Sequence, residues 1–85
     1  MPELSRFYGI IIAMYYDEHN PPHFHAKYNE HKVAIKIDDL AIIEGSLPSK
    51  ALGLVIEWAS MHMDDLNLNW NNARSGDVLF KINPL

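Results

Sequence analysis

Residues 19–28 read His-Asn-Pro-Pro-His-Phe-His-Ala-Lys-Tyr and hold three of the five histidines of the chain. The two prolines lack a backbone N–H, and their rings hold φ at about −65°. Each proline also pushes the preceding residue towards extended geometry, which excludes a helix over residues 20–23. Beyond them, an extended backbone alternates its side chains between two faces. One face then carries His23, His25 and Lys27, and the other carries Phe24, Ala26 and Tyr28. We expect a strand that packs through one face and presents two imidazoles side by side on the other.

The segments on either side of this stretch predict further strands. From residue 6 to 16 the chain is β-branched and aromatic without polar alternation, which is typical of a strand covered on both faces and placed centrally in a sheet. Residues 32–37 alternate strictly, with Val33, Ile35 and Ile37 facing inward. No helical crossover separates these runs, so we expect an antiparallel meander. The predicted strands are 6–16, 23–28, 32–37, 40–44 and 78–82, with a loop at 17–22 and turns at 29–30 and 38–39.

A helix is predicted from Pro48, a residue that suits the first helical turn. Apolar residues then recur at three- and four-residue spacing without a phase break, at Leu52, Val55, Ile56, Ala59, Met63, Leu66, Trp70 and Ala73. This pattern predicts one long helix that ends near Arg74, with Gly76 as its C-cap; a kink at residues 62–65, capped by Asp64, is the alternative. The asparagines at 67, 69, 71 and 72 are interpreted as a solvated helix end. The predicted fold class is α+β: a mostly antiparallel sheet of four to five short strands packed against one long or kinked C-terminal helix.

The composition indicates one folded domain over residues 1–85, because 48% of the residues are apolar and 11% are aromatic. The chain has no cysteine, which excludes disulfides and thiolate metal sites. No signal-like segment and no apolar run long enough to cross a bilayer is found, so we expect a cytoplasmic protein without membrane contact. The formal net charge of −4 disfavours broad binding to a nucleic-acid backbone.

Two histidines at positions i and i+2 of a strand point to one side, where both can ligate one metal ion. His23 and His25 form such a pair, and a third ligand is expected from either His19, before the prolines, or His62, in the apolar stripe of the helix. This arrangement predicts a site for a divalent metal such as zinc, nickel or manganese. The alternative interpretation is structural: His62 is a core imidazole bonded to backbone, and the motif histidines are polar residues on an open strand.

The same imidazoles also suit acid–base catalysis without a metal, because the ordinary pKa of histidine, about 6.5, lies near cellular pH. Cleavage of RNA at the 2′-hydroxyl needs an acid, a base and a cation for the phosphate. Under this hypothesis His23, His25 and His19 are the candidate catalytic residues, and Lys27 supplies the cation, with Arg6 as the alternative.

A third hypothesis is a binding module. Exposed aromatic rings make anchors for a protein partner, and an edge strand pairs with another chain. The candidate anchors are Tyr8, Tyr15, Tyr16 and Trp58, and core packing is the alternative role for these rings. A DNA-binding regulator is a further alternative, and the acidic net charge fits it least.

Four features occur together: Ser5–Ile10, the segment Asp17–Ala26, the Leu47-Pro48 pair, and the spaced residues Trp58, His62, Leu66 and Trp70. In these features the chain resembles a small bacterial family, domain of unknown function 4160, over nearly its whole length. The resemblance implies one half of a two-gene, toxin–antitoxin-like module, with a protein partner from a neighbouring gene and RNA as a target. Our leading hypothesis is therefore a component of such a module, with His19, His23, His25 and His62 as its candidate site.

Overall fold

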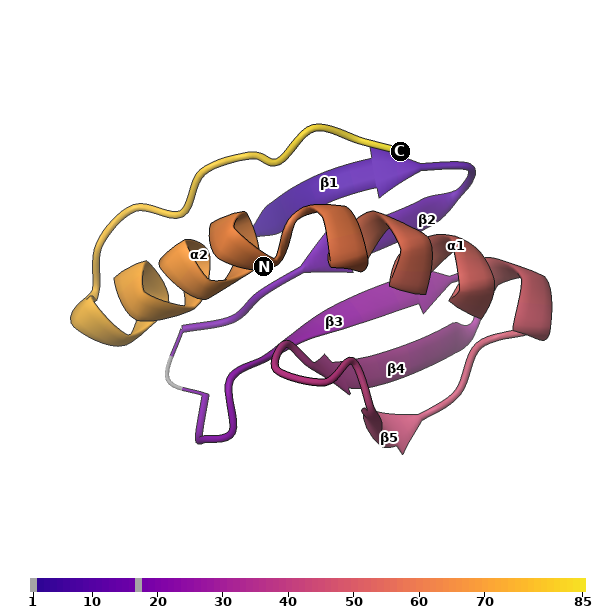
Figure 1. The fold of residues 1–85 in the computed structure, drawn as a ribbon, viewed down its shortest axis with the longest axis horizontal. Coiled ribbons are helices and arrows are strands. Elements are labelled where there is room, and N and C mark those ends of the chain that lie inside the picture. The colour runs from indigo at the N-terminus through magenta and orange to yellow at the C-terminus, as the bar shows by residue number, and fades with distance from the viewer. Residues whose placement is uncertain (1, 17) are drawn as a thin grey trace.

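The chain folds into a sheet with two helices lying across one of its faces (Figure 1). A computed structural model describes residues 2–16 and 18–85, and Asp17, in the predicted loop at 17–22, lies outside this part. Within the described residues the strands pair in chain order, every neighbour antiparallel. The elements are β1 (Glu3–Phe7), β2 (Ile10–Ala13), β3 (His23–Tyr28), β4 (His31–Lys36), β5 (Ile42–Gly45), α1 (Ser49–Met61) and α2 (Met63–Ser75). The α+β class and the antiparallel meander are confirmed.

The prediction of one central strand over residues 6–16 is wrong, because this run folds into the hairpin of β1 and β2. Phe7 pairs with Ile10, and the two residues between them have positive φ values, 50° at Tyr8 and 78° at Gly9. Such a pair makes the type I′ turn whose twist matches a hairpin. Glycine adopts this geometry without strain, whereas tyrosine is an uncommon residue there. The sheet is consequently centred on β3, with β2 and β4 on either side.

The predicted second strand, residues 23–28, is confirmed at both ends, and the next two strands are shifted by one or two residues. Asn29 has a φ of 53°, as the turn after β3 requires. Side chains that point to the helices are buried, and they include Phe24 of β3 and Val33 and Ile35 of β4. The histidines of β3 alternate with these core residues, which places His25 on the face that the helices leave uncovered.

The prediction of one long helix is wrong, because the helical region breaks at His62. His62 has φ −130° and ψ 28°, and it stands between two helices of 13 residues each. A straight helix of that combined length is about 39 Å long, whereas the molecule extends 33 Å along its longest axis. The break lets both halves pack on the sheet. Within the described chain, no helix combines the length and apolar composition that crossing a bilayer requires.

The start of α2 also differs from the predicted kink. Its N-cap is His62, which makes no capping hydrogen bond through its side chain. Asp64 and Asp65 lie in the first turn, where their negative charge favours the helix N-terminus. The predicted C-cap is confirmed: Gly76 has a φ of 74° and follows Arg74 in the last turn.

After α2, residues 77–85 form an extended tail that crosses back to β1, as Figure 1 shows in yellow. The predicted strand at 78–82 is wrong, because the tail is held mainly by side chains. Asn69 of α2 accepts the Phe80 N–H at 2.8 Å and donates to the Phe80 carbonyl at 3.2 Å. One strand-like bond remains, from Ile82 N–H to the Leu4 carbonyl at 2.8 Å. Asn69 is wholly buried, which corrects its assignment to a solvated helix end.

Trp58 of α1 lies at the centre of the core and is wholly buried, so the expectation of an exposed partner anchor is wrong for this ring. Its ring centroid lies 5.5 Å from that of Phe7 and 6.2 Å from that of Phe24. The indole N–H donates to the Asn83 carbonyl at 2.8 Å. The same side chain therefore joins the helix, the sheet and the tail.

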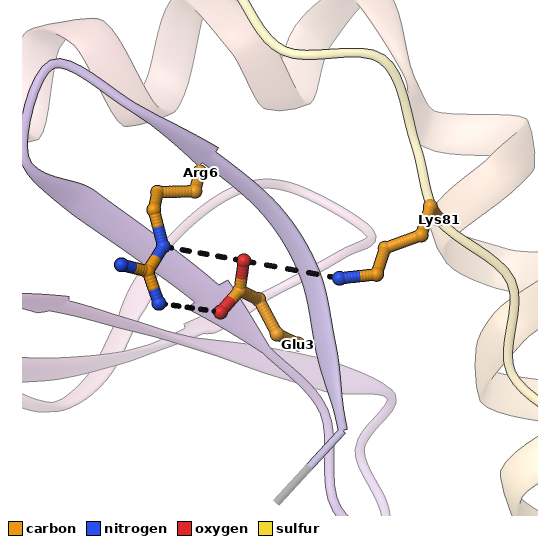
Figure 2. Close-up of polar contacts among 3 residues, drawn as sticks. All are labelled: Glu3, Arg6 and Lys81. Carbon is orange, nitrogen blue, oxygen red and sulfur yellow. Dashed lines mark hydrogen bonds and ion pairs between the residues drawn. The ribbon is translucent and has the colours of Figure 1, made fainter.

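Ionic contacts also attach the tail to β1, as Figure 2 shows. Glu3 accepts from Arg6 at 2.8 Å and lies 3.8 Å from the Lys81 ammonium. The hydrogen bond from Arg6, together with the positive charges of Arg6 and Lys81, lowers the pKa of the Glu3 carboxyl below its ordinary value. The contact with Glu3 likewise raises the pKa of Arg6.

Candidate functional site

Two imidazoles lie close together at the beginning of β3. His23 and His25 are alternate residues of one strand, and their ring centroids are 5.2 Å apart. The exposed fraction of the side chain is 10% for His23 and 30% for His25. One ring is thus embedded, and the other is open to solvent.

Glu18 completes this group, although no site role was predicted for it from the sequence. One carboxylate oxygen lies 3.0 Å from His25 Nε2, and the other lies 3.7 Å from His23 Nε2. Each of the three residues offers a ligand atom, and these atoms all lie within 4.8 Å of one another. We call Glu18, His23 and His25 the histidine–glutamate cluster.

The orientation of the His23 ring follows from the contact of its second ring nitrogen. Nδ1 lies 2.7 Å from the Pro21 carbonyl oxygen. A carbonyl oxygen only accepts hydrogen bonds, so Nδ1 carries the hydrogen. In the neutral ring the lone pair then belongs to Nε2, the atom that faces Glu18. The proline turn therefore orients the ring in addition to excluding a helix.

Aromatic rings from other elements support both imidazoles. Trp70 of α2 packs against His23 with a centroid distance of 5.2 Å, and Tyr15 meets His25 edge-on at 4.7 Å. Contacts with α2 and the tail also anchor the loop that carries Glu18. Arg74 donates to the side-chain oxygen of Asn20 at 2.8 Å, and the Tyr16 hydroxyl donates to the Asp77 carbonyl at 3.1 Å. The C-terminal half of the helical region thus positions the cluster without contributing a titratable group to it.

The other predicted site residues are not members of this cluster. In residues 2–16 and 18–85, the group with metal-ligand geometry includes neither His19 nor His62. His62 packs against Trp58, with a centroid distance of 5.3 Å, and its Nδ1 lies 3.7 Å from Asp65. Lys27 is exposed on β3, two residues beyond His25 on the same face.

The chain is thus a small α+β domain in which a histidine-bearing strand and the loop before it form a polar cluster at a sheet. The family model described as domain of unknown function (DUF4160) matches residues 9–71, and the chain belongs to this family. The predicted resemblance is thereby confirmed, and the matched region contains the whole cluster. No curated protein and no solved structure matches the chain significantly.

Proposed function

We propose that the histidine–glutamate cluster binds a divalent metal ion, with zinc as the first candidate. The orientation of His23 supports this most directly. Its Nδ1 hydrogen is committed to the Pro21 carbonyl, so Nε2 is the ring nitrogen that faces a Glu18 oxygen, at 3.7 Å. A metal ion between this nitrogen and the carboxylate oxygen would be bound by the lone pairs of both atoms. A metal-binding histidine typically donates its other N–H to a carbonyl or carboxylate in this way.

The spacing of the ligand atoms fits such an ion after a small adjustment. Ligands of a tetrahedral zinc ion lie about 3.4 Å apart, because each bond is about 2.1 Å long. Here Glu18 lies 3.0 Å from His25 and 3.7 Å from His23, and all ligand atoms lie within 4.8 Å. Movement by about an ångström brings the three atoms onto one ion.

The ligand set also favours an open coordination site over a closed structural one. Two imidazoles and one carboxylate occur in catalytic zinc sites, whose fourth position holds water or substrate. The side chains of Glu18 and His25 are each 30% exposed, which leaves that position towards solvent. A metal ion held by these residues would lower the pKa of a bound water, which is the usual basis of metal-assisted hydrolysis.

Titration of tag-free protein with Zn²⁺ by calorimetry, together with elemental analysis, tests this proposal. We expect one ion per chain, and about 10–20 °C higher thermal stability at 100 times the dissociation constant. His23→Ala and His25→Ala should each abolish the shift. His31→Ala is the matched control, because His31 lies at the exposed start of β4 beside Glu30. His62→Ala should bind zinc like wild type if Glu18, His23 and His25 are the ligands, and should lose binding if His62 is the third ligand, as one of the sequence predictions has it. Wild-type protein that binds no zinc, nickel or manganese contradicts the proposal.

RNA cleavage uses the same imidazoles and stays a prediction. In a metal-free mechanism, one imidazole takes the proton of the 2′-hydroxyl as general base, and the other, protonated, gives a proton to the leaving oxygen as general acid. The 3.0 Å contact with Glu18 orients His25 for this step. The two mechanisms differ in their response to a chelator. Cleavage that survives EDTA supports acid–base catalysis, and cleavage restored only by added metal supports the metal centre.

The protein partner from a neighbouring gene likewise stays a prediction. In the described chain, β5 is an outermost strand, and its Ile42 and Ile43 side chains are about half exposed, at 46% and 45%. An exposed strand edge is where a second chain adds by backbone pairing. Co-expression with the neighbouring gene product and co-purification test this, with Ile43→Lys as the variant expected to weaken the complex.

A further inference from the structure

A shallow hollow of about 100 Å³ lies beside the histidine–glutamate cluster on the uncovered face of the sheet. Ile11 and Ala13 contribute its apolar lining, and Tyr15 and His25 line it at the end nearest the cluster. Lys27 and Lys32 also line it. The hollow therefore combines an apolar surface, an aromatic ring and two cations next to a candidate metal centre.

Lys27 and Lys32 are directly opposite each other on β3 and β4. Like charges at opposed positions of an antiparallel pair destabilise a sheet. Both side chains are exposed, and among residues 2–16 and 18–85 neither forms an ion pair with a carboxylate. Lys36, at the other end of β4, by contrast lies 3.5 Å from Asp39. An anion placed between the two ammonium groups removes the repulsion.

The position of the lysines along the strand limits the size of the ligand. His25 and Lys27 are alternate residues of β3, so their side chains leave the sheet about 7 Å apart. A ligand whose anionic group binds the two lysines therefore reaches the cluster with its other end if a few bonds separate the two ends. The apolar lining between the two ends suits a short carbon skeleton or sugar ring.

We propose that this hollow binds a small phosphate monoester. Lys27 and Lys32 hold the phosphate, and a hydroxyl or carbonyl oxygen at the far end approaches Glu18, His23 and His25. The second contact rests on the metal centre proposed above, whereas the phosphate contact stands without it. A phosphate group fits this site better than a long polyanion, because the hollow is small and the chain as a whole is acidic, with a net charge of −4.

Calorimetric titration with ribose 5-phosphate tests the proposal, with ribose and inorganic phosphate as separate arms. Metal-free protein should bind ribose 5-phosphate and inorganic phosphate but not ribose. Lys27→Gln and Lys32→Gln should each weaken binding of ribose 5-phosphate about tenfold, since each removes a charged hydrogen bond. Lys50→Gln, on exposed α1 surface, is the matched control and should bind as wild type.

Zinc-loaded protein should bind ribose 5-phosphate more tightly than inorganic phosphate, and Glu18→Gln should remove that difference. Failure of the metal-free protein to bind either phosphate, or lysine variants that bind like wild type, overturns the proposal even if zinc binds. Protein that binds phosphate through the lysines but takes up no zinc refutes the metal centre and keeps the phosphate site. The two failures are therefore distinguishable.

Discussion

The histidine–glutamate cluster and the attachment of the tail use polar side chains in opposite ways. At the tail, Asn69 is wholly buried, and both ends of its amide bond the backbone of Phe80. In the cluster, Glu18, His23 and His25 mainly face one another, and two of the three are partly open to solvent. A buried amide whose hydrogen bonds are all made stabilises a fold. Partly exposed nitrogen and oxygen atoms that converge on one point remain available to bind a ligand. This difference in burial and hydrogen bonding separates a structural polar residue, Asn69, from the residues of the proposed site.

Asn69→Ala should give the largest effect on stability. It leaves the N–H and carbonyl of Phe80 without their partner, and each unsatisfied buried group costs about 1–3 kcal/mol. We expect the free energy of unfolding in urea to fall by about 2–4 kcal/mol. Asn67→Ala, on the exposed side of the same helix, is the control and should change it by less than about 0.5 kcal/mol. Equal losses of unfolding free energy in Asn69→Ala and Asn67→Ala would show that the hydrogen bonds between Asn69 and Phe80 do not stabilise the fold.

Glu18→Gln should change metal binding strongly and stability little, the reverse of Asn69→Ala. We expect zinc affinity to fall at least about 100-fold, more than the loss of a supporting residue causes. The free energy of unfolding of the metal-free protein should change by less than about 0.5 kcal/mol, because Glu18 is partly exposed. Calorimetry and urea denaturation of the same preparation measure both quantities. A stability loss as large as that of Asn69→Ala would make Glu18 a structural residue.

Lys32→Gln should stabilise the ligand-free protein. Removing one of two opposed like charges relieves about 0.2–1 kcal/mol of repulsion. The gain should be largest at low ionic strength and shrink with added salt, because salt screens exposed charges. Thermal melts of wild type, Lys32→Gln and Lys50→Gln across a salt series measure it. A loss of stability at low salt would show that Lys32 already has a favourable partner.

The smallest effect concerns acid stability through Glu3. The folded protein lowers the pKa of this carboxyl, chiefly through the Arg6 hydrogen bond. The contribution is therefore present above the ordinary pKa, about 4.5, and is lost as the pH falls through the lowered value. Glu3→Gln should melt slightly below wild type at pH 7, and the difference should shrink as the pH falls below 4.5. Equal melting temperatures of Glu3→Gln and wild type at every pH would mean that the contact between Glu3 and Arg6 contributes nothing to stability.

The spacing of apolar residues in the sequence predicted the elements whose position depends on that spacing. The strand at 23–28 has its predicted bounds, because alternating side chains and the preceding prolines both favour the same geometry. The hairpin was missed because its turn is Tyr8-Gly9 rather than one of the usual asparagine–glycine or aspartate–glycine pairs. The helix break was predicted only as the alternative, a kink at residues 62–65, because the apolar spacing continues through His62. The limit on helix length comes from the size of the folded molecule, which local spacing does not encode.

The candidate site was predicted in part for a similar reason. His23 and His25 follow from the i, i+2 spacing on a strand. Glu18 belongs to a loop without periodicity, and its approach to both imidazoles depends on the path of that loop against α2. A carboxylate just before a proline turn was the available signal. Asn69 was misjudged because its partner, Phe80, is 11 residues away in a segment predicted to be a strand.

The two tryptophans of the chain report on the two regions separately. Trp70 packs against His23 of the cluster, and the Trp58 indole N–H bonds the Asn83 carbonyl of the tail. Intrinsic fluorescence thus offers one emitter for each. In Trp58→Phe the remaining emission follows the environment of His23, and in Trp70→Phe it follows release of the tail. Occupation of the cluster and detachment of the tail can then be recorded in unlabelled protein as independent optical signals.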